Sequence, residues 1–289
     1  MQGGRADGAP DAVPGVVKVG SGGSGRPGGA GGAKKQGEPD NADRCRAVLS
    51  GPPQRGPERP ALHVVRDAIV SCERCPRLRA YCAEVARTKK RAHRDEVYWG
   101  KPVPGFGDPD ARLLLVALAP AAHGANRTGR VFTGDGPMGS GDFLMGALHR
   151  AGFANIPTAQ RIDDGLTLTD TFIAAAVRCA PPDNKPAPDE IANCLAHLDA
   201  EVRALPRVRV VVALGRIGFE AYLQLLRRRG MDLRPRPDFG HGVAHTLPGG
   251  QLLIGCYHPS RQNTNTGRLT AMMMDDVFRR AARALQTAR

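Results

Sequence analysis

Four short runs of apolar residues, each bounded by polar or turn-forming residues, stand out along the chain. They are residues 112–118 (RLLLVAL), 172–177 (FIAAAV), 208–214 (VRVVVAL) and 252–256 (LLIGC). Continuous apolar runs of this length are typical of parallel strands that are buried on both faces. We therefore predict a central four-stranded parallel sheet.

Helix-like segments surround and separate these runs. We expect helices over residues 61–70, 76–90, 142–151, 188–204, 215–229 and 269–286. Strands that alternate with helices predict an α/β fold with three layers, α/β/α. Ligands of such sheets bind beyond the carboxyl ends of the strands, so the segments after the four runs should carry the function.

The first 58 residues differ in composition from the rest. They hold 15 of the 36 glycines and 7 of the 24 prolines, and no aromatic residue. Such a segment buries too little apolar surface to offset the entropy of ordering its backbone. We predict a disordered tail over residues 1–58 and a folded domain over residues 59–289, which is long enough for a sizeable core.

Composition also narrows the class of protein. No apolar run reaches the roughly 18 residues that a membrane span needs, and the N-terminus lacks the apolar stretch of a secretory signal. We expect a cytoplasmic protein, without a membrane partner, whose seven cysteines are reduced.

The net charge of +13 favours polyanionic partners, and arginine outnumbers lysine 34 to 7. A GC-rich genome can also explain the arginine excess, but it does not explain the sign of the net charge.

Four cysteines have the spacing of metal ligands. Cys72 and Cys75 form a C-x2-C pair, and Cys179 and Cys194 follow with 14 residues between them. Four thiolates suit both zinc and an iron–sulfur cluster, so the spacing leaves both open. The remaining cysteines are interpreted as ordinary buried thiols: Cys45, Cys82 and Cys256.

The segment after the first run, residues 117–135 (ALAPAAHGANRTGRVFTGD), is rich in glycine. Arg127 and Arg130 can reach phosphate, Phe132 offers a flat face for stacking, and Asp135 is a lone carboxylate among basic neighbours. The segment has neither of the common phosphate-loop patterns. Alternatively, Phe132 is a core anchor and Asp135 a helix N-terminal charge.

The segment after the last run, residues 257–270 (YHPSRQNTNTGRLT), is too polar to belong to the core. Such a loop can bind a nucleic-acid backbone and form hydrogen bonds with a base edge. We favour functional roles for His258 and Asn263, and helix capping for Asn265 and Thr266.

Five blocks in order resemble the iron–sulfur uracil-DNA glycosylases, closest to the type-b (family five) branch. The blocks lie at residues 72–76, 98–108, 117–135, 176–186 and 258–270. The resemblance implies a four-stranded parallel sheet between helices. It also implies a 4Fe–4S cluster, of structural role, on the C-x2-C pair and the later two cysteines.

The implied reaction is DNA repair: a uracil in double- or single-stranded DNA is flipped out and its N-glycosidic bond is hydrolysed, leaving an abasic site. Phe132 would stack on the base, His258 would donate a hydrogen bond to its carbonyl oxygen, and Asp135 would hold the attacking water. Further contacts to the base are expected from Asn184 and Asn263. Contacts to DNA phosphates are expected from Arg127, Lys185, Arg261 and Arg268, with Gln262 and Asn263 placed to enter the vacated stack.

Two departures from the sister branches bear on chemistry and specificity. Leu118 and Ala119 occupy the positions where other branches carry a water-placing polar residue, which leaves Asp135 as the candidate. Ala175 stands where the sister branch has a uracil-reading Asn, so other deaminated bases such as hypoxanthine should also be released. We expect a bacterial monomer that associates with the nucleoid through DNA. The alternative is a non-catalytic, zinc-bearing nucleic-acid-binding module.

Overall fold

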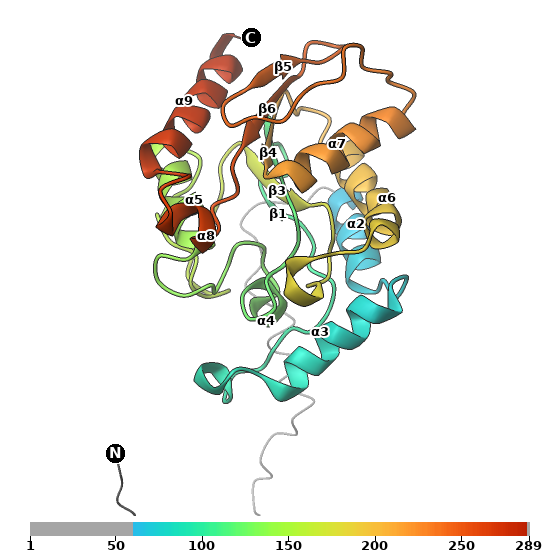
Figure 1. Cartoon of the computed structure of the whole chain (residues 1–289), viewed down its shortest axis with the longest axis vertical. Coiled ribbons are helices and arrows are strands. Elements are labelled where there is room, and N and C mark those ends of the chain that lie inside the picture. Colours follow the sequence, from blue (N-terminus) through green and yellow to red (C-terminus); the bar gives the residue numbers. More distant parts are fainter. Residues whose placement is uncertain (1–59, 288–289) are drawn as a thin grey trace, which may run out of the picture. The chain divides into compact units, whose positions relative to one another are not determined.

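The computed structural model describes residues 60–287 and contains a six-stranded sheet of order β1-β3-β2-β4-β6-β5 (Figure 1). The predicted tail and Cys45 lie outside the described residues. The strands are β1 (Phe106–Gly107), β2 (Leu113–Ala117), β3 (Thr171–Ala175), β4 (Val210–Leu214), β5 (Ala244–Thr246) and β6 (Leu252–Cys256).

The four apolar runs form β2, β3, β4 and β6, which pair in parallel at the centre of the sheet. The expected four-stranded sheet was nevertheless incomplete, because β1 and β5 pair antiparallel at its two edges and make the sheet mixed. β1 has only two residues and β5 is the polar-containing tripeptide AHT, which is half-buried or exposed. Neither segment has the length or the apolar content that identifies a strand in a sequence.

Side chains on the central strands alternate between two cores. Leu113 and Leu115 point into the core beneath α5 (Ser140–Arg150) and α9 (Ala271–Thr287). Leu114 and Val116 point into the core beneath α2 (Pro60–Val70), α6 (Pro188–Ala204) and α7 (Arg216–Arg228). The helices cover both faces of the sheet, with α5 and α9 on one side and α2, α6 and α7 on the other (Figure 1). Burial on both faces explains why the central strands are continuously apolar.

The helix bounds follow the predicted segments closely. They are α2 (Pro60–Val70), α3 (Pro76–Thr88), α4 (Ala125–Thr128), α5 (Ser140–Arg150), α6 (Pro188–Ala204), α7 (Arg216–Arg228), α8 (Arg261–Asn265) and α9 (Ala271–Thr287), with short 3-10 turns η1 (Arg91–His93) and η2 (Pro182–Asn184). The short helices α4 and α8 lie inside segments that we expected to be loops. Among the described residues, no helix combines the length and the hydrophobicity of a membrane span.

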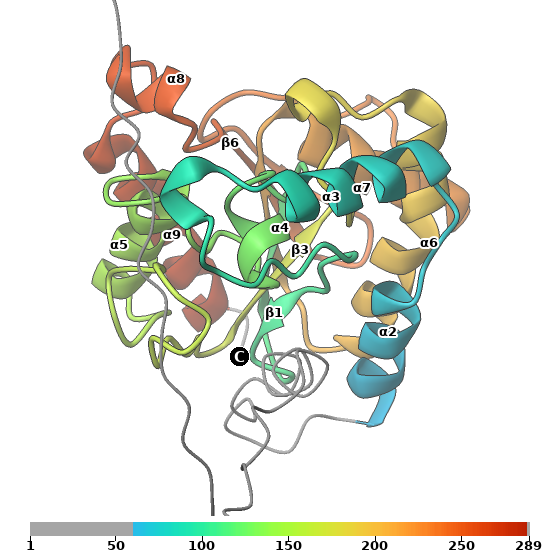
Figure 2. The same ribbon diagram turned by 90° about the horizontal axis from the view of Figure 1, so that it is seen from below.

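Helices α3 and α4 pack against each other at the end of the sheet where β2 and β3 finish (Figure 2). The segments that leave β2, β3 and β6 therefore gather at this end. These are the segments in which the sequence concentrates its candidate functional residues.

Candidate active site and cysteine cluster

The loops after β2 and β6 meet through two contacts. The ring of Phe132 stacks on the imidazole of His258, with ring centroids 5.8 Å apart and an interplanar angle of 28°. The Arg261 Nη2 donates a hydrogen bond to the Asp135 carbonyl oxygen at 3.1 Å. The fold therefore brings the loop that carries Phe132 and Asp135 next to the loop that carries His258.

The Asp135 carboxylate lies directly against the backbone of Gly124, where any side chain would collide with its Oδ1. Burial raises the pKa of Asp135, while the positive charges of Arg261 and Arg127 and a hydrogen bond from the Gly141 backbone partly oppose the rise. A partly buried carboxylate beside cations is suited to orient a water molecule and to stabilise developing positive charge.

His258 is neutral at neutral pH, because burial lowers the pKa of its imidazole to about 4. A neutral imidazole has one N–H donor and one acceptor, so it can donate to a developing oxyanion without carrying charge beforehand. The backbone of this residue is held by Asn263, whose Nδ2 donates to the His258 carbonyl oxygen at 2.8 Å.

That hydrogen bond changes the interpretation of Asn263. We expected its amide to contact the base, but α8 turns the residue back toward His258 and one N–H of its amide is already used. The caps of the two adjacent helices also differ from those expected. Ser260 caps α8 and Thr270 bonds the first turn of α9, whereas the Thr266 hydroxyl donates to the Gln262 carbonyl oxygen at 2.6 Å.

Two predicted phosphate contacts are instead internal. The buried Arg127 guanidinium pairs with Glu96 and donates to the Gly134 carbonyl oxygen at 2.7 Å. The buried Arg130 guanidinium pairs with Asp164 at 2.7 Å. Both side chains satisfy acceptors within the folded protein and are buried, so this arrangement does not support the phosphate contact expected from Arg127.

The other predicted contacts lie on the surface. Lys185, Arg261 and Gln262 are exposed, and the exposed Arg268 holds its guanidinium carbon 4.9 Å from the centroid of the Tyr257 ring. Asn184 is exposed in η2 with a left-handed φ of 57°. These residues remain candidates for contacts to base and backbone.

Ala175 ends β3 beside Ala117, the last residue of β2. Side chains alternate along a strand, so Ala175 shares its face with Ile173 and Ala117, which belong to the core against which Phe132 packs. It is only 2% exposed. The small side chain thus lies on the Phe132 side of the sheet.

Three of the predicted metal ligands, Cys75, Cys179 and Cys194, share a buried cluster with Cys82 beside α3. The Cys75 thiol interacts electrostatically with Cys72 and Cys179, and the Cys194 thiol interacts with Cys75 and Cys179. The fold therefore brings together cysteines that the sequence separates by about a hundred positions, and all of those described are free thiols.

The surroundings of these cysteines bear on which metal group they could hold. Within residues 60–287, no group of acidic, His or Cys side chains closes around a single ion. This finding is compatible with a cubane iron–sulfur cluster, because such a cluster holds its four thiolates farther apart than a single zinc ion does. Hydrogen-bond donors also face the sulfurs: Asn193 Nδ2 lies 3.7 Å from Cys75 Sγ, and the Arg79 guanidinium interacts electrostatically with Cys179. This donor-rich environment fits thiolates that bind an iron–sulfur cluster.

Sequence reasoning missed a buried ion pair next to this cluster. Arg178 Nη2 lies 2.6 Å from Glu201 Oε2, and both side chains are almost fully buried. The Glu201 Oε1 also accepts the Gly105 backbone N–H at 2.8 Å, while the Arg178 Nε has no partner in the described part of the chain. The only sign of this pair in the sequence is a charged residue, Arg178, between the apolar run at residues 172–177 and the candidate ligand Cys179.

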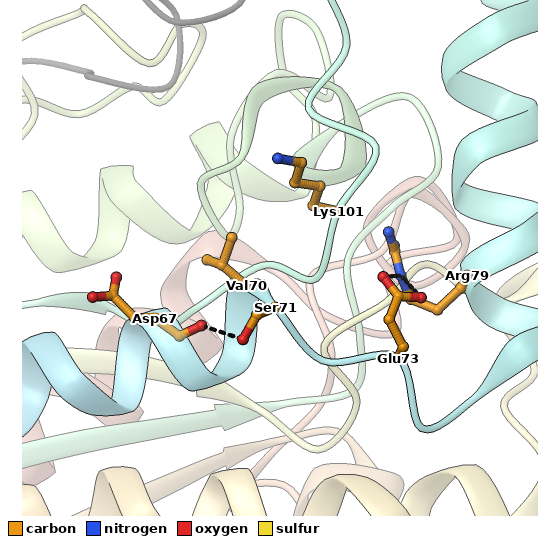
Figure 3. A pocket seen from close by; sticks show the side chains of 6 residues that line it. All are labelled: Asp67, Val70, Ser71, Glu73, Arg79 and Lys101. Carbon is orange, nitrogen blue, oxygen red and sulfur yellow. Dashed lines mark hydrogen bonds and ion pairs between the residues drawn. The ribbon is translucent and has the colours of Figure 1, made fainter.

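A solvent-open pocket of about 310 Å³ lies beside the first turn of α3 (Figure 3). Its lining residues are Asp67, Val70, Ser71, Glu73, Arg79 and Lys101. The side chains carry both signs of charge, and Arg79 pairs with Glu73 at 3.2 Å. Because neither Asp135 nor His258 lines this pocket, we place the candidate active site at the loops after β2 and β6.

The chain is similar to proteins of one known family. Residues 104–286 match the Uracil DNA glycosylase superfamily. The chain is 52% identical over 217 residues to a Type-5 uracil-DNA glycosylase of Mycobacterium bovis, covering 74% of this chain and 79% of that protein. It is also 52% identical over 215 residues to a Type-5 uracil-DNA glycosylase of Thermus thermophilus, covering 74% and 94%. A Type-4 uracil-DNA glycosylase of Pyrobaculum aerophilum is 30% identical over 173 residues, covering 60% and 69%.

Proposed function

This chain belongs to the uracil-DNA glycosylase superfamily, and we infer that it is a uracil-DNA glycosylase that excises uracil during DNA repair. The reaction is hydrolysis of the N-glycosidic bond, and its products are the free base and an abasic site. The observation that supports specific residue roles is the meeting of Asp135, Phe132 and His258 at one end of the sheet.

Breaking the glycosidic bond develops negative charge on the base and positive charge on the sugar. We propose that the flipped base stacks on Phe132 and receives a hydrogen bond from neutral His258 at its carbonyl oxygen. A preorganised donor of this kind stabilises the transition state without protonating the base beforehand. Asn263 acts through His258, since it fixes the backbone from which the imidazole projects.

Asp135 is assigned to the water and the sugar. Its carboxylate faces the Gly124 backbone and lies near the positive charge of Arg261. Once deprotonated, it can orient the attacking water and stabilise the oxocarbenium-like sugar. The apolar side chains of Leu118 and Ala119 leave it as the carboxylate available in this loop for that role.

The cysteine cluster is proposed to bind a 4Fe–4S cluster through Cys72, Cys75, Cys179 and Cys194. The supporting observations are the mutual interactions of the four thiols and the donors that face their sulfurs. The bound group would supply a covalent link between the N-terminal end of α3 and the segment joining β3 to α6. Cys82 is proposed to remain a thiol, since its Sγ lies 3.6 Å from the Ala180 carbonyl oxygen, to which it donates.

The residue roles are tested by single-turnover cleavage of a deoxyuridine-containing duplex, with abasic sites revealed by alkali. We expect His258→Ala to slow release about 10²–10³-fold, the usual cost of a lost oxyanion donor, and Asp135→Asn to impair release clearly. Asp163→Asn is the matched control, because Asp163 is an exposed carboxylate paired only with a surface arginine. Wild-type rates in both site variants would refute the assignments.

A further inference from the structure

Residues 136–139 (GPMG) form a tight turn directly after Asp135. The Gly139 N–H donates to the Gly136 carbonyl oxygen at 3.0 Å, with Pro137 and Met138 at the two central positions. Met138 has a φ of 56°. Proline followed by a positive φ is the pattern of a type II turn, whose third position favours glycine or asparagine. A methionine there holds its backbone in a strained conformation.

The side chain of Met138 gains no burial in return for this strain. It is 87% exposed, the highest value among the large exposed hydrophobic side chains of the described residues. The backbone is nevertheless anchored, since the Met138 N–H donates to Asp142 Oδ2 at 3.1 Å and Asp142 Oδ1 accepts the Ala159 N–H at 3.0 Å. The fold therefore presents an apolar side chain to solvent on a fixed support.

The turn lies at the edge of the candidate active site. Arg261, the first residue of α8, donates to the Asp135 carbonyl oxygen at 3.1 Å, and a side chain at Gly136 would come within 3.6 Å of the same guanidinium. Met138 is thus three positions from Asp135, on a turn that contacts the start of α8. Pro137 beside it is also exposed, so the tip of the turn is apolar.

We propose that the Pro137–Met138 tip is a wedge that enters the DNA base stack where the target nucleotide leaves it. The proposal rests on the proposed function, because only an enzyme that flips a base creates such a gap. Methionine and proline are among the apolar side chains that proteins insert between base steps. Exposed Arg261 stands beside the turn to hold the phosphate backbone while Met138 occupies the gap.

Helix α8 offers the competing candidate. Gln262 is exposed on it, whereas Asn263 is committed to the His258 carbonyl oxygen. An amide side chain retains its need for hydrogen bonds inside a base stack, but a thioether does not. This difference favours Met138 as the residue that fills the gap.

The test compares duplex with single-stranded DNA, because only the duplex has a stack to fill. Met138→Gly removes the side chain and also suits the left-handed backbone, so its melting temperature should equal or exceed that of the wild type. We expect single-turnover uracil release from duplex to fall about tenfold or more, with release from a single strand changed less than about twofold. Met138→Leu, which keeps an apolar side chain at this position, should retain the wild-type rate on duplex DNA.

Two further measurements sharpen the result. Val64→Ala, which shortens a 66% exposed apolar side chain on α2, should leave both rates unchanged. In a duplex with 2-aminopurine beside a non-hydrolysable 2′-fluorinated deoxyuridine, the fluorescence rise on binding wild-type protein should be lost with Met138→Gly and kept with Met138→Leu.

Equal losses on duplex and single strand would overturn the wedge, because they would show that the turn shapes the site. Unchanged duplex release in Met138→Gly would overturn it too, and a duplex-specific loss in Gln262→Ala alone would assign the wedge to α8. Each of these three results would leave the proposed function intact. That function would fail separately if wild-type protein released no uracil from either substrate.

Discussion

The Phe132 ring stacks on the His258 imidazole at 5.8 Å, and the phenylalanine that makes this contact has a left-handed backbone with a φ of 53°. A positive φ is uncommon for a bulky residue and is retained where the surrounding structure requires it. The loop after β2 therefore fixes the position of the aromatic face, and the loop after β6 fixes the donor beside it.

Replacing Phe132 by leucine should remove the flat face and preserve most of the apolar volume. Stacking of a base on an aromatic ring is worth about 1–3 kcal/mol, so uracil release under subsaturating conditions should fall about 5–150-fold. Phe132→Tyr keeps the ring and serves as the control. Full activity of the leucine variant would show that the ring is only a core anchor.

Replacing Arg261 by glutamine should shift the pH dependence of uracil release. Burial raises the pKa of Asp135 and the Arg261 charge lowers it, so removing that charge raises it further. The reaction needs the carboxylate form, hence the acidic limb of the single-turnover rate should move to higher pH. Burial lowers the pKa of His258 to about 4, so His258 is neutral at neutral pH.

Arg268→Gln is the matched control for that experiment. Arg268 is an exposed arginine from the same segment, stacked on Tyr257, and it is not among the charges that act on Asp135. The acidic limb of the single-turnover rate of Arg268→Gln should coincide with that of the wild type when the enzyme saturates the DNA. Identical acidic limbs of the pH–rate profile in the Arg261→Gln variant and the wild type would contradict the role given to Asp135.

Replacing Cys194 by serine should lower the iron content of protein purified without oxygen, from about four irons per chain in the wild type. Cys82→Ser is the control, since Cys82 lies in the same buried cluster but is not a proposed ligand. Its iron content and visible absorbance should remain near wild type. Stoichiometric zinc in the wild type, or equal iron loss in both variants, would refute the ligand set.

Replacing Glu201 by alanine should destabilise the protein by about 3–5 kcal/mol in denaturant unfolding, because it leaves the buried Arg178 guanidinium without its carboxylate. Glu84→Ala removes the partner of Arg87 in an exposed pair and should cost about 0–1 kcal/mol. A similar small loss for both would show that the buried pair is compensated by other contacts.

Replacing Ala175 by asparagine should raise the ratio of uracil release to hypoxanthine release. We propose that the wild type releases both bases, because a polar site discriminates strongly only when a wrong ligand leaves its groups unpaired, and Ala175 offers no such group. Ala175→Leu, which adds apolar volume similar to that of asparagine but no hydrogen-bonding group, tests whether added volume alone matters at this 2% exposed position. An unchanged ratio in the asparagine variant, or no hypoxanthine release by the wild type, would disprove this explanation of specificity.

The sequence by itself determined the strands and helices that depend only on the composition of a short segment of chain. The apolar runs that became β2, β3, β4 and β6 are buried on both faces, so their composition alone identifies them. The bounds of α6, Pro188–Ala204, agree with the prediction because proline and acidic residues mark its start. The motif blocks likewise identified the family.

Only the tertiary structure decided which polar side chains are free to act. Arg127 and Arg261 are both arginines in polar loops, yet Arg127 is enclosed by Glu96 and the Gly134 carbonyl oxygen and Arg261 remains exposed. Asn263 is occupied because α8 turns it toward His258. The partners of such groups are set by how distant segments fold back on one another, and local composition carries no record of those long-range contacts.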